Sequence, residues 1–109
     1  MFDLYLACPY SDPDPRVQHE RFRLVTQTAG RLFNDGLMVF SPISKTHPIA
    51  VNCGLPGDWE FWERYDRIAI GHCRELWVLT LDGWQTSKGV RAEIQIATEL
   101  QKPIVYIGM

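Results

Sequence analysis

The sequence predicts an α/β domain with a parallel sheet of about four strands between layers of helices. Short apolar runs suited to strands alternate with longer segments of helical spacing, and this alternation gives parallel strands with right-handed crossovers. The predicted strands cover 2–7, 37–40, 76–81 and 103–107, and the predicted helices cover 16–35, 58–73 and 89–100. We expect a single domain over residues 1–109, a flavodoxin/Rossmann-like three-layer sandwich with strand order 2-1-3-4.

Proline and glycine punctuate the first half of the chain. The apolar run 2–7 is typical of a strand buried on both faces, and the loop after it contains three prolines, in Cys8-Pro9-Tyr10-Ser11-Asp12-Pro13-Asp14-Pro15. The helix 16–35 is expected to end before Gly36, which suits a left-handed C′ position. Residues 44–57 contain two prolines and two glycines and are expected to form a loop.

The predicted helix 58–73 is apolar on two faces. Asp58 is its expected N-cap. One arc of about 100° contains Asp66, and Phe61, Tyr65 and Ile68 lie on the far side. The apolar members of the first arc are Trp59, Trp62, Ala69, Ile70 and Cys73. We expect this helix to lie between the sheet and a second subunit of a homo-oligomer, with placement on two sides of one core as the alternative.

Composition and charge argue against several classes of protein. A net charge of −2 and a pI near 5.8 disfavour binding to a nucleic-acid polymer. No apolar run approaches the ~20 residues that span a bilayer, and the N-terminus lacks the basic region of a signal peptide, so a cytoplasmic protein is expected. The cysteines Cys8, Cys53 and Cys73 and the three histidines are widely spaced, so no disulfide framework, metal site or cofactor is predicted.

Glu93 is the only charged residue on the apolar face of the predicted helix 89–100. At about 100° per residue from Val90, Ile94 falls near 40°, Ala97 near −20° and Glu93 near −60°. Ligands of open α/β sheets bind where strand carboxyl ends meet helix amino ends, so a carboxylate there is suited to act as base, acid or nucleophile. The structural alternative is that Glu93 caps backbone groups or pairs with a buried arginine.

Familiar α/β motifs are missing from the loops expected beside Glu93. The chain has no Gly-x-Gly-x-x-Gly loop, no phosphate-binding P-loop and no Gly-x-Ser-x-Gly elbow. A response-regulator receiver needs an acidic pair directly after the first strand, whereas Asp12 and Asp14 come late, between prolines. What is left is a carboxylate crevice. It suits displacement at an anomeric carbon, where one carboxylate traps an oxocarbenium-like centre and a second acid protonates the leaving group.

The crevice would contain three carboxylates, Glu93 and Asp66 on two helices and Asp82 at a strand end. Tyr5 on the first strand would add a buried phenol that needs a partner, for which Glu93 is a candidate. The candidate substrate-binding residues are Pro9, Tyr10, Ser11, His47, Asp82, Gly83, Trp84, Ser87 and Gly89. The glycines Gly83 and Gly89 would leave room for a sugar, and Trp84 would stack on a base. Ordinary turn chemistry for Asp82-Gly83 and an N-cap role for Ser87 are the structural alternatives.

Three motifs resemble those of a known family: Tyr-Leu-Ala-x-Pro-Tyr-Ser at 5–11, Ser-Pro-Ile at 41–43, and Leu-Asp-Gly-Trp-x-x-Ser-x-Gly-Val-x-x-Glu-Ile at 81–94. They are similar to a small bacterial and phage family of unassigned function, usually grouped with the nucleoside 2-deoxyribosyltransferase-like superfamily. The resemblance to the small family covers essentially the whole chain. The resemblance to the characterised enzymes is confined to the crevice motifs.

In the characterised transferases, a tyrosine on the first strand orients a nucleophilic glutamate, and an aspartate in the preceding helix contacts the leaving base. The resemblance assigns these roles to Tyr5, Glu93 and Asp66. Related deoxynucleoside-monophosphate glycosidases have a phosphate-binding serine at the position of Ser87, but this chain lacks their glycine-rich loop after the first strand.

The resemblance therefore implies cleavage or transfer at the N-glycosidic bond of a (deoxy)nucleoside or its 5′-monophosphate, through a glycosyl-glutamate intermediate. The ligand would be this small molecule, with no membrane and no nucleic-acid polymer involved. Two alternatives stay open: a nucleotide-sensing module without turnover, and an accessory protein that associates through helix 58–73.

Overall fold

A four-stranded parallel sheet forms the centre of the computed structural model, which describes residues 1–109. The strands are β1 (Phe2–Ala7), β2 (Val39–Phe40), β3 (Cys73–Leu79) and β4 (Ile104–Ile107). Their order is β2-β1-β3-β4, which confirms the predicted topology. Because β1 pairs in parallel with β3 from Phe2↔Cys73 to Ala7↔Val78, the carboxyl ends of these strands lie side by side.

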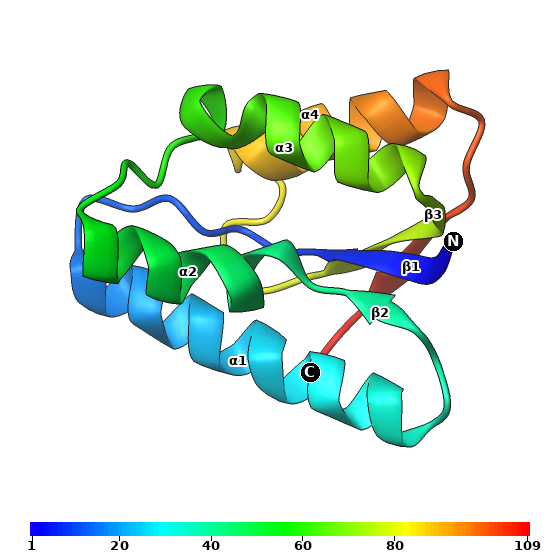
Figure 1. The fold of residues 1–109 in the computed structure, drawn as a ribbon, viewed down its shortest axis with the longest axis horizontal. Helices are drawn as coiled ribbons and strands as arrows, with labels where there is room; N and C mark the ends of the chain where they lie inside the picture. The colour runs from blue at the N-terminus through cyan, green and yellow to red at the C-terminus, as the bar shows by residue number, and fades with distance from the viewer.

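Helices cover both faces of the sheet. Figure 1 shows α1 (Pro15–Asn34) and α2 (Pro42–Cys53) on one face, and α3 (Trp59–Gly71) and α4 (Lys88–Glu99) on the other. β1 supplies a core to each layer, since successive strand residues point to opposite faces. Leu4 and Leu6 pack on the α1 side, and Tyr5 and Ala7 on the side of α3 and α4. All four are buried, as the apolar run predicted.

The predicted loop 44–57 is wrong, because most of it belongs to α2, so the domain has four helices instead of three. Pro42 stands in the first turn, where its missing N–H costs nothing, and Gly54 ends the helix in a left-handed conformation with φ of +65°. Pro48 inside the helix was the misleading signal. The buried His47 and Ala50 pack against the domain, and this burial offsets the weak helical propensity.

The other helices and strands begin and end within a few residues of the predicted boundaries. α3 ends at Gly71, so Cys73, which was predicted on that helix, is instead the first residue of β3 and is fully buried. Asp58 caps α3 by accepting from the amide of Phe61, and Gly36 follows α1 with φ of +91°, both as predicted. None of the helices combines the length and the apolar character needed to cross a membrane.

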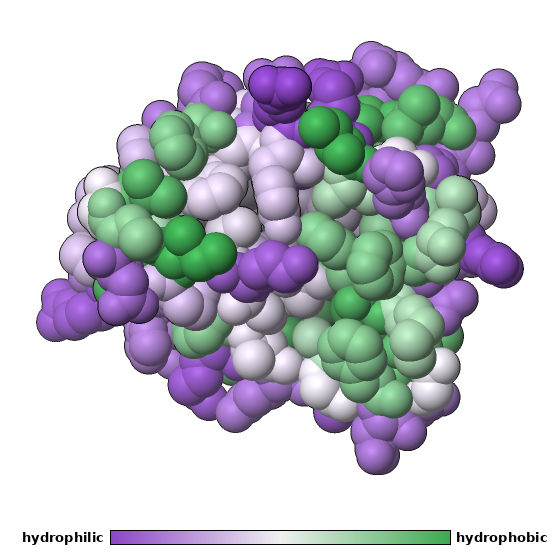
Figure 2. Space-filling view, in the orientation of Figure 1, coloured by the Kyte–Doolittle hydropathy of each residue, from purple (hydrophilic) through white to green (hydrophobic).

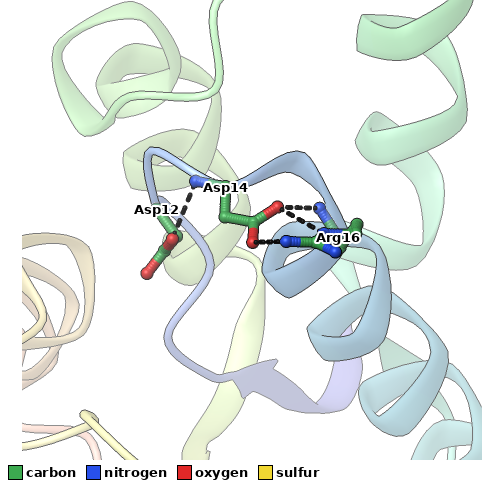
Figure 3. Close-up of polar contacts among 3 residues, drawn as sticks. All are labelled: Asp12, Asp14 and Arg16. Carbon is green, nitrogen blue, oxygen red and sulfur yellow. Dashed lines mark hydrogen bonds and ion pairs between the residues drawn. The ribbon is translucent and has the colours of Figure 1, made fainter.

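The acidic residues after β1 organise the start of α1. The Asp12 carboxylate accepts a hydrogen bond from the Asp14 amide at 2.8 Å, and Asp14 accepts from both the amide and the guanidinium of Arg16 (Figure 3). Asp14 is therefore a helix cap and not part of an acidic pair beside β3. These contacts argue further against a receiver-type site.

Candidate active site

A pocket of about 400 Å³ opens at the carboxyl ends of β1 and β3. Its walls come from the loop after β1, from α2, from the start of α3 and from the loop that leads into α4. Eight of the predicted site residues line it: Pro9, Tyr10, Ser11, Asp66, Gly83, Ser87, Gly89 and Glu93. The volume lies within the range of about 300–1,000 Å³ that is usual for small-molecule sites.

Glu93 is the buried carboxyl group of the pocket. Only 6% of its surface is exposed, and the Tyr5 hydroxyl donates to its Oε2 atom at 2.5 Å. Glu93 forms no ion pair, so pairing with a buried arginine is not the reason for its position. Tyr5 does not line the pocket. It is fully buried on β1, and its hydroxyl group binds the Glu93 carboxyl group from the side of the sheet.

The two carboxyl groups of the pocket have raised pKa values. Burial, and then the charge of Asp66, raise the pKa of Glu93 to about 8, against an opposing effect of the Tyr5 hydrogen bond. Burial raises the pKa of Asp66 to about 6, again partly offset by Tyr5. Because the groups interact, they titrate as a pair that holds one proton between these values. One ionised and one protonated carboxyl at neutral pH is the requirement of acid–nucleophile chemistry.

Burial and both carboxylates raise the pKa of Tyr5 well above its usual value. The phenol therefore keeps its proton and acts as a permanent donor to Glu93. This contact favours the ionised form of Glu93 and fixes its orientation.

Four predicted site residues lie outside the pocket lining. Trp84 packs against Tyr106, with ring centroids 5.3 Å apart, and against the core. Asp82 contributes its backbone carbonyl to Arg21. His47 is buried on α2 and contacts the Tyr10 hydroxyl group, and Tyr5 is buried on β1 and contacts Glu93.

His47 supports the pocket wall from α2. Its Nδ1 atom is 2.6 Å from the Tyr10 hydroxyl, and its Nε2 atom is 3.4 Å from Nδ1 of the exposed His19. Its ring stacks on Phe22 with centroids 4.5 Å apart. Burial lowers the pKa of His47, and the nearby His19 lowers it further, so the ring is neutral at pH 7 and positions Tyr10.

Several pocket residues were not predicted. The Arg21 guanidinium donates to the carbonyls of Tyr10, Ser11 and Asp82 and so ties the loop after β1 to the loop after β3. Trp59 and Trp62 form part of the α3 wall. Both tryptophans share the predicted arc of Asp66, which was an available signal, whereas nothing local in the sequence marks Arg21.

Ser87 and Lys88 stand where α4 begins, at the rim of the pocket. The Ser87 hydroxyl accepts from the Val90 amide at 3.2 Å, so the N-cap reading is correct, and the same residue also lines the pocket. Lys88 forms an ion pair with Glu60 of α3 across the rim. No cluster of three or more histidine, cysteine or acidic side chains is arranged to hold a metal ion.

The fold and this pocket define a Rossmann-like α/β domain with one buried and one half-buried carboxyl group at the switch point of its sheet. Residues 3–109 match the model of a family described as Domain of unknown function (DUF1937), and the chain belongs to that family. No curated protein matches the sequence.

Proposed function

We propose that this protein cleaves or transfers the N-glycosidic bond of a nucleoside or nucleotide through a covalent glycosyl-Glu93 intermediate. The observation that carries the proposal is the buried Glu93 carboxyl group, held by Tyr5 beside Asp66 in a pocket of small-molecule size. The similarity of the crevice motifs to nucleoside 2-deoxyribosyltransferases supports the same chemistry.

The reaction starts from the state with one proton on the pair, in the arrangement that places this proton on Asp66. This arrangement is the less populated one, because Glu93 has the higher pKa. The ionised Glu93 forms a bond to C1′ while the C1′–N bond breaks, and the electron pair of that bond goes to the base. Asp66 gives its proton to the departing base. Water in a hydrolase, or a second base in a transferase, then attacks C1′ and gives a proton to Asp66, and the electron pair of the ester bond returns to Glu93.

The test is a screen of nucleosides and their 5′-monophosphates for release of the free base. Glu93→Ala is expected to abolish release, because it removes the carboxylate that would form the bond to C1′. Asp66→Asn is expected to slow release by about 10²-fold, the usual contribution of one acid. Base release at the wild-type rate in the Glu93→Ala protein would contradict the mechanism.

A second candidate is a sensor that binds a nucleotide without turnover. One observation favours it: with a pKa near 8, Glu93 is largely protonated at neutral pH and is then a poor nucleophile. Saturable binding of a nucleoside or nucleotide, with no base released over many hours, would select this function.

A further inference from the structure

The density of charge in the pocket differs from that of the molecule as a whole. Five carboxyl groups line it (Asp12, Asp58, Glu60, Asp66 and Glu93), against two basic groups (Arg21 and Lys88). With one proton shared by Glu93 and Asp66, the lining carries a net charge of −2, as much as the entire chain. The negative charge of the protein is therefore concentrated in the pocket.

Both basic groups of the lining are already engaged within the protein. Lys88 is paired with Glu60, and the Arg21 guanidinium donates to three backbone carbonyls. Lys88 is held by its carboxylate partner, and Arg21 keeps only two of its five N–H groups for a ligand. A 5′-phosphorylated ligand would bring about two negative charges toward Glu93 and Asp66, and like charges repel most strongly where water is excluded.

Aromatic rings complete the pocket. Trp59 and Trp62 line it from α3, and Tyr10 lines it from the loop after β1. The Trp62 indole N–H is committed to the carbonyl of Pro56 at 2.7 Å, which fixes the ring. Tryptophan faces together with carboxylates are the chemistry that binds a flat organic cation.

The environment of Glu93 is also suited to a cationic ligand. It is more than nine-tenths buried, it lines the pocket, and only its Oε2 atom has a hydrogen-bond partner. A cation in the pocket would favour ionisation of this carboxyl group, since an opposite charge stabilises the charged form. Ligand binding would thus generate the nucleophile.

From the charge and the aromatic lining of the pocket, we propose that its ligand is an unphosphorylated nucleoside whose base carries a fixed positive charge, such as an N-alkylated purine or a pyridinium. The inference rests on the proposed function. For such a substrate, the C1′–N electron pair neutralises the departing base, so no proton from Asp66 is needed. Water then cleaves the glycosyl-Glu93 ester, and one proton is released to solvent per turnover.

The binding test uses the Glu93→Gln protein, so that no turnover interferes; the other four carboxyl groups of the lining are left to attract the cation. The probes are 7-methylguanosine at pH 6, where its base is cationic, and 7-methyl-7-deazaguanosine, its neutral counterpart of the same shape. We expect the cation to bind at least about tenfold more tightly by calorimetry, with a preference that falls as salt is added. Equal binding of the two, or tighter binding of 7-methylguanosine 5′-monophosphate, would overturn the inference.

Two variants locate the effect. Glu60→Gln and Trp62→Leu are each expected to reduce the preference for the cation several-fold, whereas Glu99→Gln, an exposed change on α4 remote from the pocket, leaves it unchanged. Thermal melts check that each variant is folded. A preference that survives both pocket changes would contradict the site.

Turnover by the wild-type protein separates this inference from the proposed function. Release of base from neutral nucleosides, without the binding preference, supports the function and overturns the inference. Preferential binding of the cation, with no base released from any nucleoside, supports the inferred ligand and overturns the function.

Discussion

At the scale of a single residue, burial of Glu93 makes the stability of the protein depend on pH. Its pKa rises from 4.5 to about 8 on folding, so the folded state favours the protonated carboxyl group. Stability from this group is fully present below pH 4.5 and is lost as the pH rises through 8. The pKa of the half-buried Asp66 shifts in the same direction and adds to the effect.

Glu93→Gln is therefore expected to stabilise the protein. The amide keeps the shape of the side chain and removes the cost of protonating Glu93 on folding, which is on the order of 3 kcal/mol at pH 7. Urea unfolding at pH 5 and pH 8 measures the change, and the gain should be larger at pH 8. Glu99→Gln, at an exposed site, is the control and should change little. A variant less stable than the wild type at both pH values would contradict the assignment.

The carboxyl pair also predicts the pH dependence of base release. The reactive state holds one proton, so the rate should rise as the pH passes about 6, the pKa of Asp66, and fall as it passes about 8, the pKa of Glu93. Rates of base release from a neutral nucleoside between pH 4.5 and 9.5 test this. A rate that increases steadily across the whole range would exclude a shared proton.

The residue roles could be predicted only in part. The face of Glu93 follows from the angle between neighbours on one helix, and its burial is as expected. The hydrogen bond from Tyr5 joins residues 88 apart in the chain. It was suggested by the need of a buried phenol for a partner and by the resemblance to a family, and by no local pattern. The place of His47 depends on Phe22 and His19 of another helix, so no local pattern could reveal that it supports Tyr10.

At the scale of elements, α2 shows where sequence patterns fail. A proline within a helix lacks the N–H that bonds to the carbonyl four residues earlier, so Pro48 was read as a sign of a loop. The helix forms because Pro42, His47 and Ala50 are buried against the rest of the domain. Tertiary packing outweighs local propensity here, and a single sequence does not display that packing.

Replacement of this proline tests the explanation. Pro48→Ala restores the missing backbone donor in the middle of α2 and is expected to stabilise the protein by about 1–3 kcal/mol. Pro42→Ala is the matched control, because a proline in the first turn loses no hydrogen bond and the change removes buried surface, so it should give no gain. Thermal and urea unfolding of both variants provide the comparison. Equal effects of the two substitutions on stability would show that a proline costs as much in the first turn of α2 as in its interior.

At the scale of the whole molecule, the strand order was predicted from the alternation of strands and helices together with the doubly wound arrangement that this alternation indicates. The surface was harder to interpret. Figure 2 shows apolar side chains gathered over β2 and the adjoining ends of β1 and α3. Phe2, Phe61, Tyr65 and Ile68 are each at least 36% exposed. The far side of α3 is thus not covered within one chain, which removes the alternative that both of its faces belong to one core.

We propose that this surface of α3 joins two copies of the chain. Ile68, with 55% of its surface exposed, lies on the face of α3 that the pocket does not use. Ile68→Glu should convert the assembly to monomers in sedimentation experiments, because a charge placed in an apolar interface is left unpaired. Arg67→Glu, next to it but in an ion pair with Glu63, tests whether charge alone has this effect. A wild-type protein that sediments as a monomer at all concentrations would contradict the proposal.

Mass spectrometry of Glu93 tests the proposed chemistry most directly. The protein would be incubated with a nucleoside that carries fluorine at C2′, which slows hydrolysis of the glycosyl ester, and then digested. We expect the peptide that contains Glu93 to gain the mass of the fluorinated sugar while the free base is released, and we expect the Glu93→Gln protein to show neither change. Release of base from wild type and variant alike, with no sugar on this peptide, would contradict the role of Glu93 as nucleophile.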